Sequence, residues 1–311
     1  MILTVCPNTA LDKIIFIKKW THGFPMRTNK MVTSVGGKGL NASVTLSQLG
    51  VDTVALGFFE GKIGIELIEL LQEYKIIPEP VWVGGNNRIS YVIAEEETNI
   101  HSHIIVGELE VNSNQVHEFI SRYNSRLSEA RFVILAGTIP PSLPDDFYCE
   151  MIRLANQVGV PTLIDTQKQY MLHALKAKPD IVKMNKEEFG WTFSYDVVTF
   201  HDLIQCAKEV KIANDIRNLV ITLAKDGIIA FTTDGNFLAK APVQKAVNAA
   251  GAGDSVSAAL AWRLSLGKDW KDALLWSSAV SAASVLTPRT GDIRLIDVSR
   301  ILKEVELIQI D

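Results

Sequence analysis

The chain has few cysteines and lacks any long hydrophobic run. Its 311 residues include only Cys6, Cys149 and Cys206, an odd and widely spaced set that does not suit a disulfide framework and is typical of a reducing compartment. No stretch approaches the roughly 18 consecutive apolar residues that a membrane-spanning helix needs. Residues 1–5 lack the basic start of a signal peptide. We therefore expect a cytoplasmic protein that does not engage a membrane.

A strong excess of one charge is also absent. The net charge is −4, which argues against a general nucleic-acid binder and leaves room for a local basic pocket that holds a small anion. Hydrophobic residues make up 47% of the chain and charged residues 21%, as in an ordinary globular protein. We find no sequence repeats and no low-complexity linkers. The length suits one α/β domain, residues 1–311, with an insertion.

Two common nucleotide-binding motifs are missing as well. The chain contains no GxxxxGK[ST] loop, and no GxGxxG follows its first strand pattern. What it does contain is Gly-Ala-Gly-Asp at 251–254, directly before a stretch whose large apolar residues recur at every fourth position. That spacing predicts a helix over 255–266. A glycine-rich turn at a helix start presents free backbone N–H groups and binds anions, phosphate above all.

The carboxylate that ends this turn has two interpretations. Beside a bound phosphoryl group, Asp254 could take the proton from an attacking hydroxyl. Alternatively, Asp254 only caps the helix, a common role for aspartate. A second glycine-rich turn, Gly-Gly-Lys-Gly at 36–39, also precedes a predicted helix. It is either an anion or hydroxyl site that uses Gly37, Lys38 and Asn41, or simply a tight turn.

Hydrophobic periodicity predicts strands that alternate with helices, hence a mostly parallel central sheet covered by helices on both faces. Two β-rich pieces, at about 13–35 and 81–106, do not fit the alternation, and we expect them to form a small separate sheet, a lid over the strand ends. The predicted helices are 41–49, 63–74, 112–130, 145–158, 186–193, 203–213, 254–266, 270–286 and 297–304; the predicted strands are 2–6, 54–58, 132–136, 162–164, 181–183, 219–223 and 228–232.

Six short motifs occur in a recognisable order. Asn-Thr-Ala-Leu-Asp at 8–12 is followed by GGKGxN, an arginine in the second β-rich piece, Asn-x-x-Glu after a strand, Thr-x-x-Lys-Asp-Gly at 222–227, and GAGD. This combination resembles the PfkB (ribokinase-like) carbohydrate kinases over essentially the whole chain. Within them it is most similar to the phosphosugar branch, which includes 1-phosphofructokinases and tagatose-6-phosphate kinases. The resemblance implies a ribokinase-like three-layer α/β/α fold.

The resemblance also implies a use of ATP and Mg²⁺. Asp254 would be the catalytic base, and the backbone N–H groups of Gly251, Ala252 and Gly253 would hold the γ-phosphoryl oxygens. Asn185 and Glu188 would order Mg²⁺ and its waters, with Glu188 acting through water; the alternative is a solvated helix start. Thr222 and Gly227 would contact the nucleotide; the alternative is a hairpin turn at 226–227.

On the sugar side, the resemblance implies that Asp12 accepts hydrogen bonds from sugar hydroxyls, with Gly37 and Asn41 beside it. Arginine suits the phosphate that the substrate already carries, because its guanidinium can make paired charge-assisted bonds. The phosphate-binding residues would be Lys38, Arg27 and Arg88, with hydroxyls from Ser90 and Thr138. For both arginines the alternative is charge on the lid surface.

The expected reaction is the phosphorylation of a ketohexose phosphate, fructose 1-phosphate to the 1,6-bisphosphate. Tagatose 6-phosphate, an unphosphorylated sugar or nucleoside, and a non-catalytic role as a sugar-phosphate sensor stay as alternatives. Lid strands of this family pair between subunits, so we expect a homodimer through the lid. The chain departs from the family pattern at four positions, where Thr9 and Met184 replace proline, and Ala224 and Ala259 replace glycine.

Overall fold

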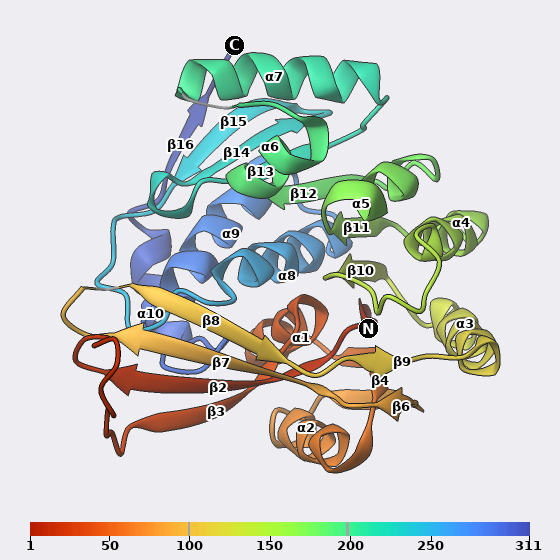
Figure 1. Ribbon diagram of the computed structural model, residues 1–311. Coiled ribbons are helices and arrows are strands. Elements are labelled where there is room, and N and C mark those ends of the chain that lie inside the picture. Colours follow the sequence, from red (N-terminus) through yellow and green to blue (C-terminus); the bar gives the residue numbers. More distant parts are fainter. Residues whose placement is uncertain (99, 197–198) are drawn as a thin grey trace.

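The structure is a computed structural model that describes residues 1–98, 100–196 and 199–311. Its centre is a ten-stranded sheet in the order β16-β15-β14-β13-β12-β11-β10-β1-β4-β5 (Figure 1). The strands from β5 to β13 run parallel, and those from β13 to β16 are antiparallel. Their bounds are β1 Ile2–Cys6, β4 Thr53–Phe59, β5 Ile77–Trp82, β10 Phe132–Ala136, β11 Thr162–Asp165, β12 Ile181–Asn185, β13 Leu219–Thr222, β14 Ile228–Thr232, β15 Gly235–Lys240 and β16 Glu306–Gln309.

Helices cover both faces of this sheet because its central strands are apolar on both sides. Every residue of β1, β4 and β10 is buried. One face packs against a core to which α3–α7 contribute, and the other against α1, α8 and α9. The helices are α1 Lys38–Gln48, α2 Gly61–Glu73, α3 Ser113–Leu127, α4 Phe147–Gln157, α5 Lys168–Leu175, α6 Lys186–Phe193, α7 Phe200–Ala213, α8 Ala252–Ser265, α9 Trp270–Ser284 and α10 Leu295–Leu302. The predicted three-layer ribokinase-like α/β architecture is confirmed.

A second, separate sheet has four strands in the order β3-β2-β7-β8 and corresponds to the small sheet predicted from the sequence as a lid; we refer to it as the lid. Its strands are β2 Ala10–Ile17, β3 Met31–Gly36, β7 Arg88–Glu95 and β8 His101–Val106. The second β-rich piece was expected to start at about residue 81, but β5 extends to Trp82 and pairs with β4 in the central sheet. The lid part therefore begins at Arg88. Strand propensity alone does not say which sheet a strand joins, because pairing partners lie far away in the sequence.

Several elements were not predicted from the sequence. They are α5, β15, β16 and a two-stranded pair formed by β6 Gly84–Gly85 and β9 Leu109–Glu110. Most are short, and the exposed pattern of β16 offers no apolar alternation to detect. Among the helices of the described residues, none combines the length and the hydrophobicity required to cross a bilayer.

Candidate active site

The site lies where the parallel strands end. From β1 the next strands of the central sheet, β4 and β5, are added on one side, whereas β10 to β13 are added on the other side. The direction in which strands are added therefore reverses between β1 and β10. Open α/β sheets bind ligands at the carboxyl ends of the strands beside such a reversal. Asn8 follows β1 and Thr138 follows β10, and the Asn8 Nδ2 donates to the Thr138 Oγ1 at 3.2 Å. Asp165 and Asn185 end the next two strands, β11 and β12.

The turn before α8 has the geometry of an anion-binding helix start. Gly251 adopts φ +79°, and a Cβ there would lie 2.6 Å from the Thr290 Cγ2, so only glycine fits. The Ser255 N–H bonds back to the Gly251 carbonyl at 2.9 Å. Within the part of the chain that the structure describes, the N–H groups of Gly253 and Asp254 have no hydrogen-bond partner, whereas the Ala252 N–H, which was also predicted to hold a phosphoryl oxygen, donates to the Ala249 carbonyl at 3.4 Å. The Gly253 and Asp254 N–H groups are therefore available to a phosphoryl oxygen.

A lysine lies directly beneath this turn. A Cβ on Gly253 would come within 2.9 Å of the Lys183 Nζ, so the absent side chain makes room for the ammonium group. Lys183 is almost fully buried on β12 and forms an ion pair with the Asp165 Oδ2 at 2.7 Å. The positive end of the α8 dipole and this ammonium therefore act together on any anion at the turn.

Asp254 is held in a state suited to accepting a proton. The residue is 7% exposed, and its Oδ2 accepts a hydrogen bond of 2.8 Å from the Asn41 Nδ2. Burial, reinforced by the charge of Asp165, raises the pKa of Asp254 to about 6, although Lys183 and Lys38 act in the opposite direction. A carboxylate with a pKa near 6 is ionised at neutral pH and is a stronger base than an exposed aspartate.

A buried ion-pair network supports the turn from below. Asp165 is fully buried, and its carboxylate contacts the Lys38 Nζ at 2.8 Å, the Lys183 Nζ at 2.7 Å and the Ser257 Oγ at 3.1 Å. Burial alone would raise the pKa of Asp165, but the two ammonium groups lower it to about 2. Lys38 also contacts the Glu188 Oε1 at 2.6 Å. The network thus joins α1, β11, β12 and α6.

Asn185 and Glu188 start α6 in a capping box. The Glu188 N–H donates to the Asn185 Oδ1 at 2.7 Å, and the Asn185 N–H donates to the Glu188 Oε2 at 3.0 Å. The residues do start a helix, but Glu188 is buried rather than solvated, and both of its carboxylate oxygens already have partners. Carboxylate and amide oxygens are the ligands that Mg²⁺ prefers, and Mg²⁺ usually keeps several of its waters. The oxygen atoms of these residues would suit a hydrated Mg²⁺ that Glu188 contacts through water, which is the role that the family resemblance implies.

The sugar-side residues gather at the start of the lid. Asp12 is buried, its Oδ2 accepts a hydrogen bond of 3.0 Å from the Thr290 Oγ1, and burial together with the charge of Asp254 raises its pKa to about 7. Ser90 lies beside Asp12 in the β2–β7 register, and Arg88 lies beside Ala10. Arg88 is half-buried, and among the described residues it forms no salt bridge, which leaves its guanidinium available to an anion.

The structure does not bring all the predicted residues together. Arg27 is exposed on the connection between β2 and β3, at the opposite end of the lid from Arg88, because Arg88 pairs with the first residue of β2 and that connection follows the last. Lys38 is engaged by Asp165 and Glu188 rather than by lid residues.

The two predicted nucleotide contacts lie at the far end of the row of parallel strands. Thr222 pairs with Asn185 at the ends of β13 and β12, and Gly227 adopts φ +105° before β14. The strands β13 and β14 are antiparallel and joined by a short 3₁₀ turn over Ala224–Asp226. The hairpin interpretation is thus realised in the backbone. Ala224 adopts φ +50°, a conformation that favours the glycine it replaces.

Four polar residues of the site were missed in the sequence: Asp165, Lys183, Ser257 and Thr290. A usable signal existed for one of them. Lys183 sits inside an otherwise apolar strand, and a lysine in such a place is almost always paired or functional. The other three have ordinary local surroundings, and only the fold brings them to the site.

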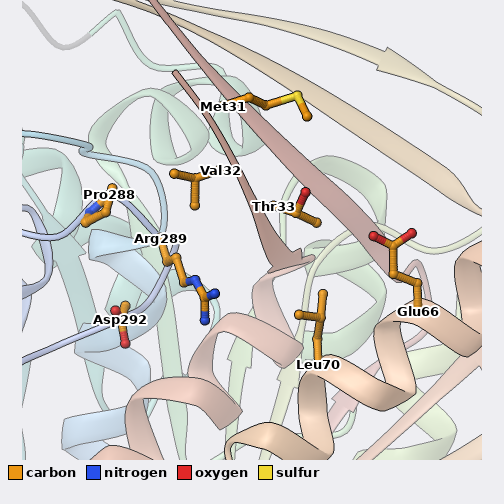
Figure 2. Close-up of a pocket in the computed structure, with 8 residues that line it drawn as sticks. All are labelled: Met31, Val32, Thr33, Glu66, Leu70, Pro288, Arg289 and Asp292. Atoms are coloured by element: carbon orange, nitrogen blue, oxygen red, sulfur yellow. The ribbon is translucent and has the colours of Figure 1, made fainter. Parts of the chain in front are cut away.

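A cavity of about 490 Å³ lies beside this region, between β3, α2 and the connection from α9 to α10 (Figure 2). Arg289 and Asp292 line it, whereas Thr290, between them in sequence, bonds to Asp12. None of the predicted site residues lines this cavity. We therefore assign the candidate active site by the geometry around Asp254 and not by cavity size.

Comparisons with known proteins agree on one family. Residues 9–295 match the sequence profile described as pfkB family carbohydrate kinase. The chain is 26% identical over 312 residues to a tagatose-6-phosphate kinase of Staphylococcus epidermidis, covering 100% of both chains. It is 30% identical over 259 residues to a 1-phosphofructokinase of Bacillus subtilis, covering 83% of this chain and 84% of that one. A solved structure of a possible 1-phosphofructokinase from Thermotoga maritima superposes with a TM-score of 0.89 at 26% identity, covering 100% of this chain and 99% of the other.

Proposed function

Because the chain belongs to the pfkB family of carbohydrate kinases, we propose that it transfers the γ-phosphoryl group of ATP to a ketohexose phosphate. The substrate that we propose is fructose 1-phosphate, and the product is fructose 1,6-bisphosphate. The names of the relatives support the substrate class. The full-length match to a tagatose-6-phosphate kinase favours tagatose 6-phosphate as the second candidate.

The observation that carries the proposal is the carboxylate of Asp254 beside two free N–H groups. With a pKa of about 6, Asp254 can take the proton of the sugar's free primary hydroxyl while that oxygen attacks the γ-phosphorus in line. The Gly253 and Asp254 N–H groups would donate to the γ-phosphoryl oxygens as charge moves during transfer. Catalysis would arise mainly from positioning and charge stabilisation.

The cations and the capping box would hold the nucleotide phosphates. Lys183 lies beneath the turn and adds positive charge where the γ-phosphoryl group would sit. Asn185 and Glu188 would bind the waters of a Mg²⁺ ion, which neutralises charge on the β- and γ-phosphates when bound. Thr222 and Gly227 would lie along the nucleotide, at the end of the same row of strands.

The lid would bind the sugar phosphate. Arg88 is a half-buried cation at the start of β7, and Ser90 places a hydroxyl beside Asp12. In this arrangement the guanidinium of Arg88 holds the phosphate that the substrate carries, and Asp12 accepts hydrogen bonds from the sugar hydroxyls. Closure of the lid would exclude water and so limit ATP hydrolysis.

A homodimer through the lid is part of the proposal. Within the described residues β8 pairs only with β7, so its outer edge is open. Its last three residues, Ile104, Ile105 and Val106, are each about half exposed. An apolar open edge is a template for pairing with a second chain, and this surface favours a second copy of the lid.

A coupled ADP-release assay over a panel of sugars tests the proposal. The panel contains fructose 1-phosphate, tagatose 6-phosphate, fructose 6-phosphate, fructose and ribose. We expect the highest kcat/KM with fructose 1-phosphate and only background release with the unphosphorylated sugars. Higher turnover of ribose would assign the chain to another kinase class, and the absence of sugar-dependent ADP release would indicate a non-catalytic sensor.

A further inference from the structure

One buried amide links the lid to the central sheet. Asn87 is the residue before β7, and it is 4% exposed. Its Nδ2 donates to the Thr9 carbonyl and to the Thr9 Oγ1, both at 3.1 Å, and its Oδ1 accepts from the Glu60 N–H at 2.9 Å. We refer to Thr9, Glu60 and Asn87 as the lid junction. The Thr9 carbonyl and the Glu60 N–H fix the orientation of the Asn87 amide. In the reversed orientation the amide oxygen would face the Thr9 carbonyl oxygen, and the amide NH₂ would face the Glu60 N–H.

The junction is anchored to the end of β4. Thr9 is fully buried, and its Oγ1 donates to the Phe58 carbonyl at 2.5 Å. A Cβ on Gly57 would lie 2.7 Å from the Thr9 Cγ2, so the methyl group occupies the space that this glycine leaves. The Asn87 N–H also donates to the Glu60 Oε2 at 3.2 Å. Thr9 therefore uses a hydroxyl and a methyl group where the family pattern has proline.

The junction immediately precedes the strands that carry the sugar-side residues. Thr9 is followed by Ala10 of β2 and Asn87 by Arg88 of β7, and Ala10 and Arg88 are partners in the ladder. A cavity of about 330 Å³, lined in part by Glu60, Asn86 and Asn87, lies beside it. The cavity borders the start of β7 on one side, and on the other side the hydrogen bonds of Asn87 to Thr9 and Glu60 connect β7 to the central sheet.

We infer that Asn87 is a positioning residue for the sugar-phosphate site. Together with Thr9 and Glu60 it fixes the start of β7, and thereby the guanidinium of Arg88, relative to Asp12 and the central sheet. This inference rests on the proposed function, in which Arg88 binds the substrate phosphate. Asn87 is almost fully buried, so losing its hydrogen bonds to the backbone would leave buried partners unsatisfied, and the effect of removing them should be measurable.

Asn87→Ala is the central variant, and Asn86→Ala is its matched control. Asn86 is the exposed neighbour, and its side chain makes no hydrogen bond in the described part of the chain. We expect Asn87→Ala to raise the KM for fructose 1-phosphate about tenfold, equivalent to about 1.4 kcal/mol, with the KM for ATP unchanged. Asn86→Ala should change neither. Asn87→Asp keeps the shape of the asparagine side chain but should still have a raised KM for fructose 1-phosphate, because the Thr9 carbonyl would then face a carboxylate oxygen instead of an N–H donor.

A double-mutant cycle with Arg88→Ala separates positioning from general destabilisation. If Asn87 acts through Arg88, Asn87→Ala should raise the sugar-phosphate KM less than twofold in the Arg88→Ala background. A merely structural role would give the full tenfold factor in both backgrounds and would overturn the inference. Thr9→Val should raise the KM for the sugar phosphate, because it removes the hydroxyl that bridges Asn87 and Phe58. Thr9→Ser keeps that hydroxyl and should leave the KM close to that of the unmodified protein.

Hydrogen exchange of the ligand-free protein tests the junction without turnover. We expect the amides of β7 and β2 to exchange at least fivefold faster in Asn87→Ala than in Asn86→Ala, and equal rates would overturn the inference. If the unmodified protein turns over no ketohexose phosphate, the proposed function fails, while the exchange comparison still decides whether Asn87 fixes the lid.

Discussion

Asp254→Asn should abolish activity and at the same time stabilise the protein. The pKa of Asp254 rises from its ordinary value of 3.8 to about 6 because the carboxylate is buried near Asp165. When folding raises the pKa of a group, that group's contribution to the free energy of unfolding is fully present at pH values below the unfolded pKa. The contribution is lost as the pH rises through the folded pKa. Asparagine has nearly the same shape, carries no charge, and can still accept the hydrogen bond from Asn41.

The size of the effect follows from the two pKa values. The difference of about two between the folded and unfolded pKa values corresponds to about 3 kcal/mol at pH 8, where the loss is complete, and to about half as much at pH 5. Asp254→Asn avoids this loss, so its free energy of unfolding should exceed that of the unmodified protein by about 3 kcal/mol at pH 8 and by about half as much at pH 5. The kcat should fall by about 10²–10⁴.

Urea unfolding at pH 5 and pH 8, with ADP release on the same samples, measures both effects. Asp52→Asn is the matched control, because Asp52 is exposed beside the amino end of β4 and away from the site. A variant that is inactive but equally or less stable at pH 8, or a stability difference that does not change with pH, would refute the explanation of the pKa by burial. A kcat within tenfold of the unmodified enzyme would refute the role of Asp254 as base.

Four further outcomes are expected. The kcat/KM should fall on the acid side with a midpoint between about pH 6 and pH 7, since the pKa values of Asp254 and Asp12 are raised to about 6 and about 7; a profile flat down to pH 5 would contradict this. Arg88→Ala should raise the KM for fructose 1-phosphate tenfold or more and leave the KM for ATP unchanged, because each charge-assisted bond contributes about 1.5–3 kcal/mol; an unchanged sugar KM removes Arg88 from the site. Lys183→Met should lower the free energy of unfolding by up to about 3 kcal/mol in urea, and adding Asp165→Asn should recover part of it, because the buried Asp165 carboxylate then keeps only one of its two ammonium partners, Lys38. Ile105→Lys on β8 should shift the protein from dimer to monomer in light scattering, whereas the exposed Ile296→Lys on α10 should not.

Features that depend on the local chain were predictable. The glycine at 251 is needed because φ is +79°, and the helix after it follows the four-residue apolar spacing, so the turn and α8 could be located from a few neighbouring residues. The same holds for most strands and helices, and for the order of motifs that identifies the family. Helix ends differed from the predicted ones by a few residues because capping, not apolar spacing, determines them.

The sequence by itself was enough to select candidate residues: a carboxylate after a glycine turn, a lysine after two glycines, and an asparagine and a glutamate at a helix start after a strand. The tertiary structure decided the burial, the charge partners and the pKa of these residues. It placed Asp165 between Lys38 and Lys183, drew Lys38 away from the lid, left Arg27 on a distant connection and buried Asp254 so that its pKa rises. Asp165 pairs with Lys183, 18 residues away, and with Lys38, 127 residues away, and the free energy of a charge depends on all the atoms around it, so no local pattern contains that information.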